Sequence, residues 1–115
     1  VNKKQNILIV WLKKKAQSPQ VTIKLNTALF LLYYHFGDSE TSYQITKETY
    51  ELVKSNEFLY NKRRSAWVGA LSNYISTTIA TNRYDTYKQL IKQMEASYKE
   101  SHHGIRPLIG HSTSQ

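Results

Sequence analysis

The most regular pattern in the chain is an apolar side chain every three to four residues, which predicts helices rather than strands. Ser18 and Pro19 form a typical helix start, and Gly37 is a typical left-handed stop. We therefore expect a helix over residues 19–36. Its apolar side chains lie on nearly every side, which is typical of a helix surrounded by others. The sequence predicts that this helix is the centre of the fold.

Two further amphipathic segments lie in the second half of the chain. Residues 65–80 carry one apolar stripe, which consists of Trp67, Val68, Leu71, Tyr74, Ile75, Thr78 and Ile79. The chain restarts at Asn82, and residues 84–100 carry a second stripe, which consists of Tyr84, Tyr87, Leu90, Ile91, Met94 and Tyr98. Both segments are expected to be helices that pack through these stripes.

The other segments carry weaker signals. Residues 3–16 are expected to form a first helix, although their apolar run could also be a buried strand. A shorter helix is expected over residues 46–55, and the chain after Gly104 resembles a tail, with Pro107 and Gly110. We predict an all-α fold, in which residues 1–104 form a compact single domain of four to five helices and residues 105–115 form a short C-terminal tail.

Length and composition are compatible with one domain. A chain of 115 residues can bury about two-thirds of its open-chain surface on folding. The sequence contains no Cys, which excludes disulfide scaffolds and cysteine nucleophiles within it. The apolar runs at residues 7–12 and 28–36 are shorter than a signal peptide or a membrane span requires. We expect a cytoplasmic protein without membrane contact.

Charge is distributed unevenly along the chain. The formal net charge is +8, with 16 Lys and Arg against 8 Asp and Glu. Counted by segment, it is +6 over residues 1–24, zero over 25–37, −3 over 38–57 and +5 over 58–115. Two basic regions thus flank an acidic middle. This pattern predicts an oriented basic surface rather than a uniform polycation.

Two basic clusters are the candidate binding residues. For an acidic protein partner, the expected contact surface consists of Tyr60, Lys62, Arg63 and Arg64. For nucleic acid, the same cations would act together with Lys13, Lys14 and Lys15. Tyr60 and Trp67 flank the first cluster and could stack on unpaired bases. However, Trp67 lies on an apolar stripe, which favours a buried position.

Metal binding and catalysis have weaker signals. His102, His103 and His111 lie near the C-terminus, but a zinc site needs three or four ligands on a rigid frame, and adjacent histidines point in different directions. Glu48 and Glu51 share a helix face, which is usually an ordinary solvated face. No glycine-rich phosphate loop is present. We expect no metal, no cofactor and no enzymatic activity.

Two stretches follow a family pattern. Residues 21–30 contain Lys24, Leu25 and Asn26 and then a leucine and aromatic run, and Phe58, Leu59 and Tyr60 lead to Ala66, Trp67, Val68 and Gly69. Together, over about residues 5–79, they resemble the Panacea, or SocA-like, domain. The resemblance implies a helical protein without catalysis, an antitoxin that neutralises a toxin by binding it and that occurs in prophages and mobile elements.

The leading hypothesis from the sequence is therefore a small basic protein-binding module, similar to an antitoxin or to a phage or mobile-element inhibitor. Two alternatives stay open. One is a sequence-nonspecific nucleic-acid-binding protein that uses the two basic clusters. The other is a bacteriocin immunity-type four-helix bundle, which has a similar size, charge and C-terminal tail and is an analogy of shape only.

Overall fold

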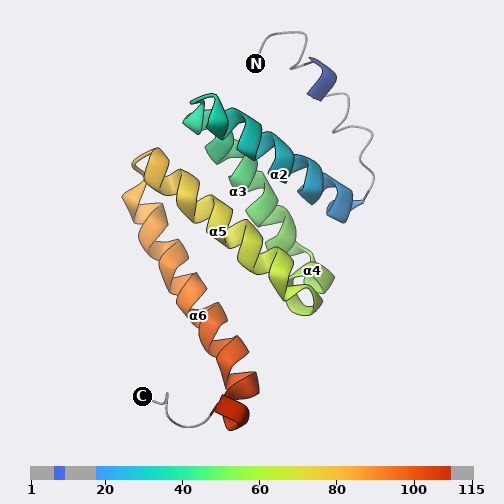
Figure 1. The fold of residues 1–115 in the computed structure, drawn as a ribbon, viewed down its shortest axis with the longest axis vertical. Coiled ribbons are helices and arrows are strands. Elements are labelled where there is room, and N and C mark those ends of the chain that lie inside the picture. The colour runs from blue at the N-terminus through green and yellow to red at the C-terminus, as the bar shows by residue number, and fades with distance from the viewer. Residues whose placement is uncertain (1–6, 10–17, 110–115) are drawn as a thin grey trace.

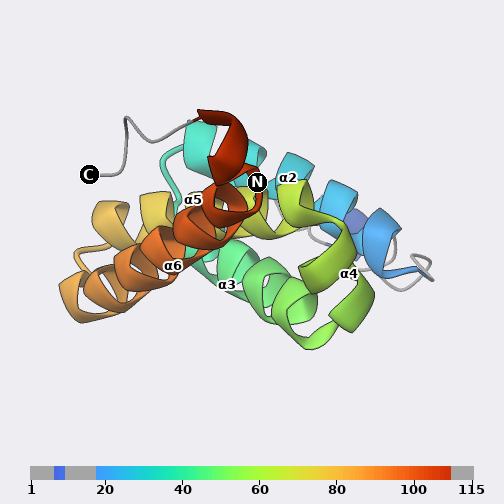
Figure 2. The ribbon, with the colours of Figure 1, turned by 90° about the horizontal axis from the view of Figure 1, so that it is seen from below.

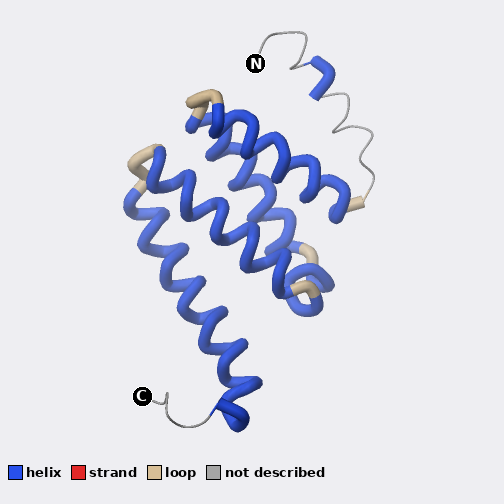
Figure 3. The backbone as a smooth tube through the Cα atoms, viewed as in Figure 1, coloured by secondary structure: helices blue, strands red, loops and turns tan. Residues whose placement is uncertain are grey.

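The computed structural model describes residues 7–9 and 18–109, with side chains up to residue 100. Beyond the helical turn at residues 7–9, it contains α2 (Pro19–His35), α3 (Ser39–Ser55), α4 (Glu57–Lys62), α5 (Arg64–Ala80) and α6 (Tyr84–Ile109) (Figure 1). Short turns join these helices, and the described residues include no strand (Figure 3). The predicted all-α fold is confirmed.

Local sequence signals define where the helices begin and turn. The Ser18 hydroxyl accepts a hydrogen bond from the Val21 N–H at 3.1 Å, and the Asp38 carboxylate accepts one from the Thr41 N–H at 3.0 Å. Gly37 adopts a φ of +84° in the turn after α2, a conformation that side chains with a Cβ rarely adopt. The helix predicted over residues 19–36 is therefore confirmed almost to the residue.

The position of α2 in the fold was not predicted correctly. α3 lies between α2 and α5 and contacts both, whereas α2 lies at the edge and packs on α3 (Figures 1 and 2). The buried side of α2 consists of Asn26, Leu29, Phe30 and Tyr33. Its outward side stays exposed although it is rich in apolar residues. The central helix is thus α3, which begins before the residues 46–55 predicted for it.

The central helix is polar in composition but well packed. Its buried side includes one Ser and two Thr, and each of these hydroxyls has a hydrogen-bond partner. Ser42 donates to the Phe30 carbonyl at 3.3 Å, and Thr49 donates to the Ile45 carbonyl at 3.0 Å. Thr46 donates to a carbonyl within α3 and also lies 2.7 Å from the Thr77 hydroxyl. With their polar atoms satisfied, these small side chains can face the core at little cost.

Aromatic side chains dominate the main core. Trp67 is 1% exposed. The centroid of its ring lies 5.6 Å from the ring centroid of Tyr50 and 4.8 Å from that of Tyr60. Its indole N–H donates to the Ser97 hydroxyl at 2.7 Å, which joins α5 to α6. The buried members of this core are Tyr43, Tyr50, Val53, Leu59, Trp67, Ala70, Leu71, Tyr74 and Leu90. The two apolar stripes expected on α5 and α6 are buried only in part, since Val68, Ile79, Tyr84 and Tyr98 are exposed.

The last helix is longer than predicted, and only residues 7–9 of the predicted first helix are described. The backbone of α6 stays helical through Gly104 and Pro107 to Ile109 instead of ending near residue 100, and it extends past the start of α5 (Figure 1). The division into a domain at residues 1–104 and a tail at 105–115 stays a prediction. Most of the helix expected over residues 3–16 lies outside the described residues. Ile9 packs against a second, smaller cluster formed by Leu29, Phe30, Tyr33 and Ile45.

Candidate functional site

Lys62 and Arg63 lie at the corner where α4 meets α5. The backbone leaves the helical region at Arg63, with φ −113° and ψ 68°, and this ends one helix and begins the next. Both side chains are exposed. The Arg63 guanidinium lies 5.9 Å from the ring centroid of Phe58, which is 53% exposed. The corner therefore presents two cations beside an accessible aromatic ring.

A pocket of about 310 Å³ lies next to this corner, between α2, α4 and α5. We call it the basic pocket; it is lined by Gln20, Ile23, Lys24, Leu59, Arg63, Ser65 and Ala66. Lys24 and Arg63 bring positive charge to it from two different helices, and Ile23 and Leu59 give it apolar surface. Sequence reasoning missed the contribution of α2, although Lys24 stands out as the one Lys, Arg, Asp or Glu of that helix.

The start of α5 adds to the positive potential of the basic pocket. Side chains cap the first turns of α2, α3 and α4, but no side chain caps that of α5. The N–H groups at a helix start carry partial positive charge and favour anions. Ser65 and Ala66, in the first turn of α5, line the basic pocket; the Ala66 N–H donates to the Arg63 carbonyl at 2.8 Å, so the contribution of this helix end is mainly its dipole. The helix end therefore acts together with Lys24 and Arg63, and the pocket suits a carboxylate or another small anion.

Arg64 and Tyr60 have structural partners of their own. Arg64 forms an ion pair with Glu100 of α6 at 3.0 Å and donates to the Tyr60 carbonyl at 3.1 Å. The Tyr60 ring is partly buried and packs edge-on against Trp67. Among the four residues predicted to bind a partner, the structure places Lys62 and Arg63 at an exposed corner. Arg64 instead links that corner to α6 through Glu100, and Tyr60 links it to the core through Trp67.

The stacking surface expected for nucleic acid is largely absent from the described residues. Trp67 lies in the core, so the prediction of a buried indole is confirmed and the stacking role considered for it is wrong. Tyr60 is occupied by its contact with Trp67. Lys13, Lys14 and Lys15 lie outside the described residues. The nucleic-acid interpretation therefore retains Lys62 and Arg63, with the Phe58 ring beside them.

The other side of the same end of α2 carries the opposite charge. Glu48 and Glu51 of α3 line a shallow hollow together with Ser18, Pro19, Thr22, Leu52 and Ser55. The first turns of α2 thus separate this acidic hollow from the basic pocket. An extended polyanion that crossed this end of the molecule would meet both carboxylates, whereas a compact acidic group in the basic pocket would not.

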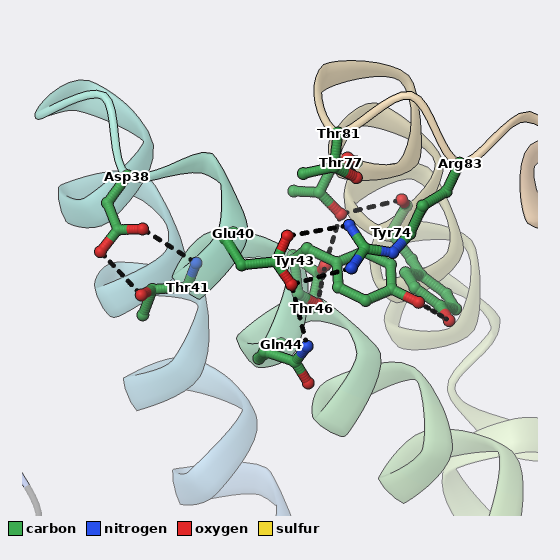
Figure 4. A network of polar contacts seen from close by, with 10 residues as sticks. All are labelled: Asp38, Glu40, Thr41, Tyr43, Gln44, Thr46, Tyr74, Thr77, Thr81 and Arg83. Carbon is green, nitrogen blue, oxygen red and sulfur yellow. Dashed lines mark hydrogen bonds and ion pairs between the residues drawn. The ribbon is translucent and has the colours of Figure 1, made fainter.

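A separate polar network joins the start of α3 to the turn between α5 and α6 (Figure 4). The Arg83 guanidinium donates to both carboxylate oxygens of Glu40, at 3.0 and 2.8 Å, and its carbon lies 3.8 Å from the Tyr43 ring centroid. The hydroxyls of Tyr43 and Tyr74 are 3.4 Å apart. The Arg83 hydrogen bonds hold the pKa of Glu40 below its ordinary value, and burial raises the pKa of Tyr74. Because these groups bind one another, the network stabilises the fold.

The structure describes only some of the residues that bear on metal binding and membrane contact. Among the side chains that the structure describes, no three His, Cys, Asp or Glu lie together in a metal-binding arrangement. The side chains of His102 and His103, and all of His111, lie outside that part. Within the described part of the chain, no helix has the length and apolar character of a membrane span.

Known proteins add nothing to this picture, since neither a protein family nor a curated protein nor a solved structure matches the chain.

Proposed function

We propose that this protein is a small protein-binding module that holds an acidic segment of its partner in the basic pocket. In this proposal it acts in the cytoplasm and neutralises its partner by direct binding, as an antitoxin or a phage or mobile-element inhibitor does. The observation that carries the proposal is the basic pocket itself, where Lys24, Arg63 and the uncapped start of α5 surround apolar side chains.

The basic pocket combines two kinds of attraction that a protein side chain can satisfy together. Ile23, Leu59 and Ala66 offer apolar contact, and a guanidinium can bind a carboxylate through two parallel hydrogen bonds. A volume of about 310 Å³ is small for a ligand site, which suits one or two anchoring side chains of a partner. Exposed Lys62 beside the pocket would speed the encounter with an acidic surface.

The same features favour a protein over a nucleic acid. Base stacking is a main source of affinity for single strands, but Trp67 is buried and Tyr60 is packed against it. Arg64 is already paired with Glu100. The resemblance of residues 21–30, which include Lys24, to the Panacea domain implies a protein partner as well.

A binding assay with defined probes tests the choice of ligand. Fluorescence anisotropy of the full chain would compare a labelled amphipathic helical peptide that carries Glu on one face, its Gln analogue, single-stranded oligothymidine and duplex DNA. We expect the Glu peptide to bind, and to bind about tenfold or more tightly than the Gln peptide, because one charge-assisted hydrogen bond is worth that much. Affinity for the Glu peptide should fall as salt is raised.

Charge-reversed variants locate the contact. The double variant Lys24→Glu and Arg63→Glu should lose most of the affinity for the Glu peptide. The double variant Lys88→Glu and Lys92→Glu, a matched charge change at exposed positions of α6, should stay within about twofold of wild type, since distant exposed charges are largely screened. An equal loss in all variants would show an effect of net charge alone. Binding of DNA without binding of the Glu peptide would favour the nucleic-acid alternative.

A genetic assay tests the neutralising role. Proteins from the native host that the wild type retains and the Lys24→Glu, Arg63→Glu variant does not are identified, and each is expressed alone and together with the chain. We expect one such protein to inhibit growth alone, and the wild type but not the variant to restore growth. A retained partner that is harmless when expressed alone would contradict neutralisation while leaving the binding contact in place.

A further inference from the structure

The last turns of α2 present an exposed apolar surface that the basic pocket does not use. We call it the α2 ridge; it consists of Ala28, Leu31, Leu32, Tyr34, His35 and Phe36, which are all exposed. Its four large apolar side chains are 40% to 66% exposed, with Phe36 the most exposed. α2 packs on α3 through its opposite side. The ridge is thus the side of α2 that faces away from α3.

The ridge carries none of the charge that characterises the rest of the molecule. Residues 25–37 contain no Lys, Arg, Asp or Glu, although the chain as a whole has a net charge of +8. An acidic partner would find no cation on the ridge to pair with. Two copies of a strongly basic chain repel one another, and this repulsion is smallest where the surfaces in contact are uncharged. The ridge is therefore a surface where two copies can meet at little electrostatic cost, and apolar contact has to outweigh the repulsion between their net charges.

The spacing of the ridge residues suits contact with an identical helix. Ala28, Leu31, Leu32 and His35 follow the i, i+3, i+4, i+7 pattern that packs one helix on another. In a two-fold dimer the same patch is used by both copies, so Leu31 and Leu32, near the middle of the ridge, would lie close to the axis. Tyr34 and Phe36 would close the sides of the contact.

The size of the ridge sets the expected strength of this contact. Its four large side chains present roughly 400 Å², about half of what each partner contributes to a standard interface. We propose that the protein forms a weak, symmetric dimer in which the α2 ridge of one copy packs against the α2 ridge of the other. The basic pocket lies toward the start of α2, around Gln20, Ile23 and Lys24, whereas the ridge occupies the last turns of the helix.

Sedimentation of the full chain from low-micromolar to near-millimolar concentration tests this proposal. We expect a shift from monomer to dimer that becomes stronger as salt is raised, because salt screens the repulsion between the copies. Binding of an acidic peptide in the basic pocket should respond to salt in the opposite direction, so the two proposals can fail separately. A monomer at every concentration, in low and raised salt, would overturn the dimer.

Two pairs of variants locate the interface. Leu31→Glu should abolish the dimer, while Val68→Glu, a matched change at an exposed apolar position of α5, should leave it intact. The chain contains no Cys, so Leu31→Cys should give a disulfide-linked dimer on oxidation and Val68→Cys should not. A dimer that survives Leu31→Glu, or that Val68→Glu also removes, would overturn the assignment. A lower unfolding temperature of Leu31→Glu than of wild type, measured at a concentration where both are monomers, would also overturn the assignment. It would mean that residues of the same chain cover the ridge.

Discussion

Asn26 is buried on the packed side of α2 with no hydrogen-bond partner in the described part of the chain, and replacing it with Leu should stabilise the protein. The side chain is 0% exposed, and among the described residues neither its amide oxygen nor its amide nitrogen has a partner. The buried Ser42 and Thr46 hydroxyls, in contrast, are hydrogen-bonded. An unpaired buried amide has lost its hydrogen bonds to water without forming new ones, and this lowers the free energy of unfolding.

The expected size of the effect follows from three contributions. Removing a buried, unpaired polar group recovers about 1–3 kcal/mol of desolvation. A Leu side chain in the same place adds favourable apolar burial, of the order of 1 kcal/mol. The change of shape from a planar amide to a branched side chain costs up to about 1.5 kcal/mol. The free energy of unfolding of Asn26→Leu should therefore exceed that of the wild type by about 1–3 kcal/mol.

Equilibrium unfolding in urea, followed by tryptophan fluorescence and circular dichroism, measures this difference. The midpoint should rise while the denaturant dependence stays unchanged, which shows that the folded and unfolded states expose the same surface as before. Thr46→Val is the matched control, and it should lower the free energy of unfolding by about 1 kcal/mol because its hydroxyl is hydrogen-bonded. If Asn26→Leu were instead destabilising by a similar amount, the amide would have a partner and the reasoning would be wrong.

Three other substitutions have defined outcomes. Gly69→Ala should raise the free energy of unfolding by about 0.5–1 kcal/mol, since Gly69 lies inside α5 and a Cβ there would meet nothing within 4 Å; a loss of stability in thermal or urea unfolding would contradict this. Trp67→Ala should lower it by about 3–5 kcal/mol through the cavity it leaves, and unaltered stability would mean that the indole is not in the core. Because Arg83 holds the pKa of Glu40 below its ordinary value, the stabilisation that Glu40→Gln removes is present near neutral pH and is lost as the pH falls through that lowered pKa. Urea midpoints of wild type and variant should therefore converge in acid, and a difference that grew in acid would contradict the assignment.

The boundaries of α2 could be predicted because their signals are local. Ser18 and Gly37 act within a few residues of their own positions, through a capping hydrogen bond and a left-handed φ. The roles of α2 and α3 could not be predicted from apolar content in the same way. The hydroxyls of Ser42 and Thr46 are satisfied by nearby carbonyls, so a helix with a polar sequence occupies the centre while an apolar helix lies at the edge.

The candidate site could be predicted only in part for a similar reason. Lys62 and Arg63 are adjacent in the sequence, so their cluster is visible without a fold. Lys24 lines the basic pocket together with residues of α4 and α5 because α2 packs on α3, which no local pattern indicates. Arg64 pairs with Glu100, which lies 36 residues further along the chain, so its structural role is not visible in the local sequence.

The most direct test of the central claim is a switch of charge preference at the basic pocket. The Lys24→Glu, Arg63→Glu variant and the wild type would each be titrated with the amphipathic Glu peptide and with a Lys peptide of the same apolar sequence. If the pocket holds an acidic segment of a partner, the wild type prefers the Glu peptide and the variant prefers the Lys peptide. A variant that still preferred the Glu peptide would contradict the claim, because the contact would then lie elsewhere on the protein.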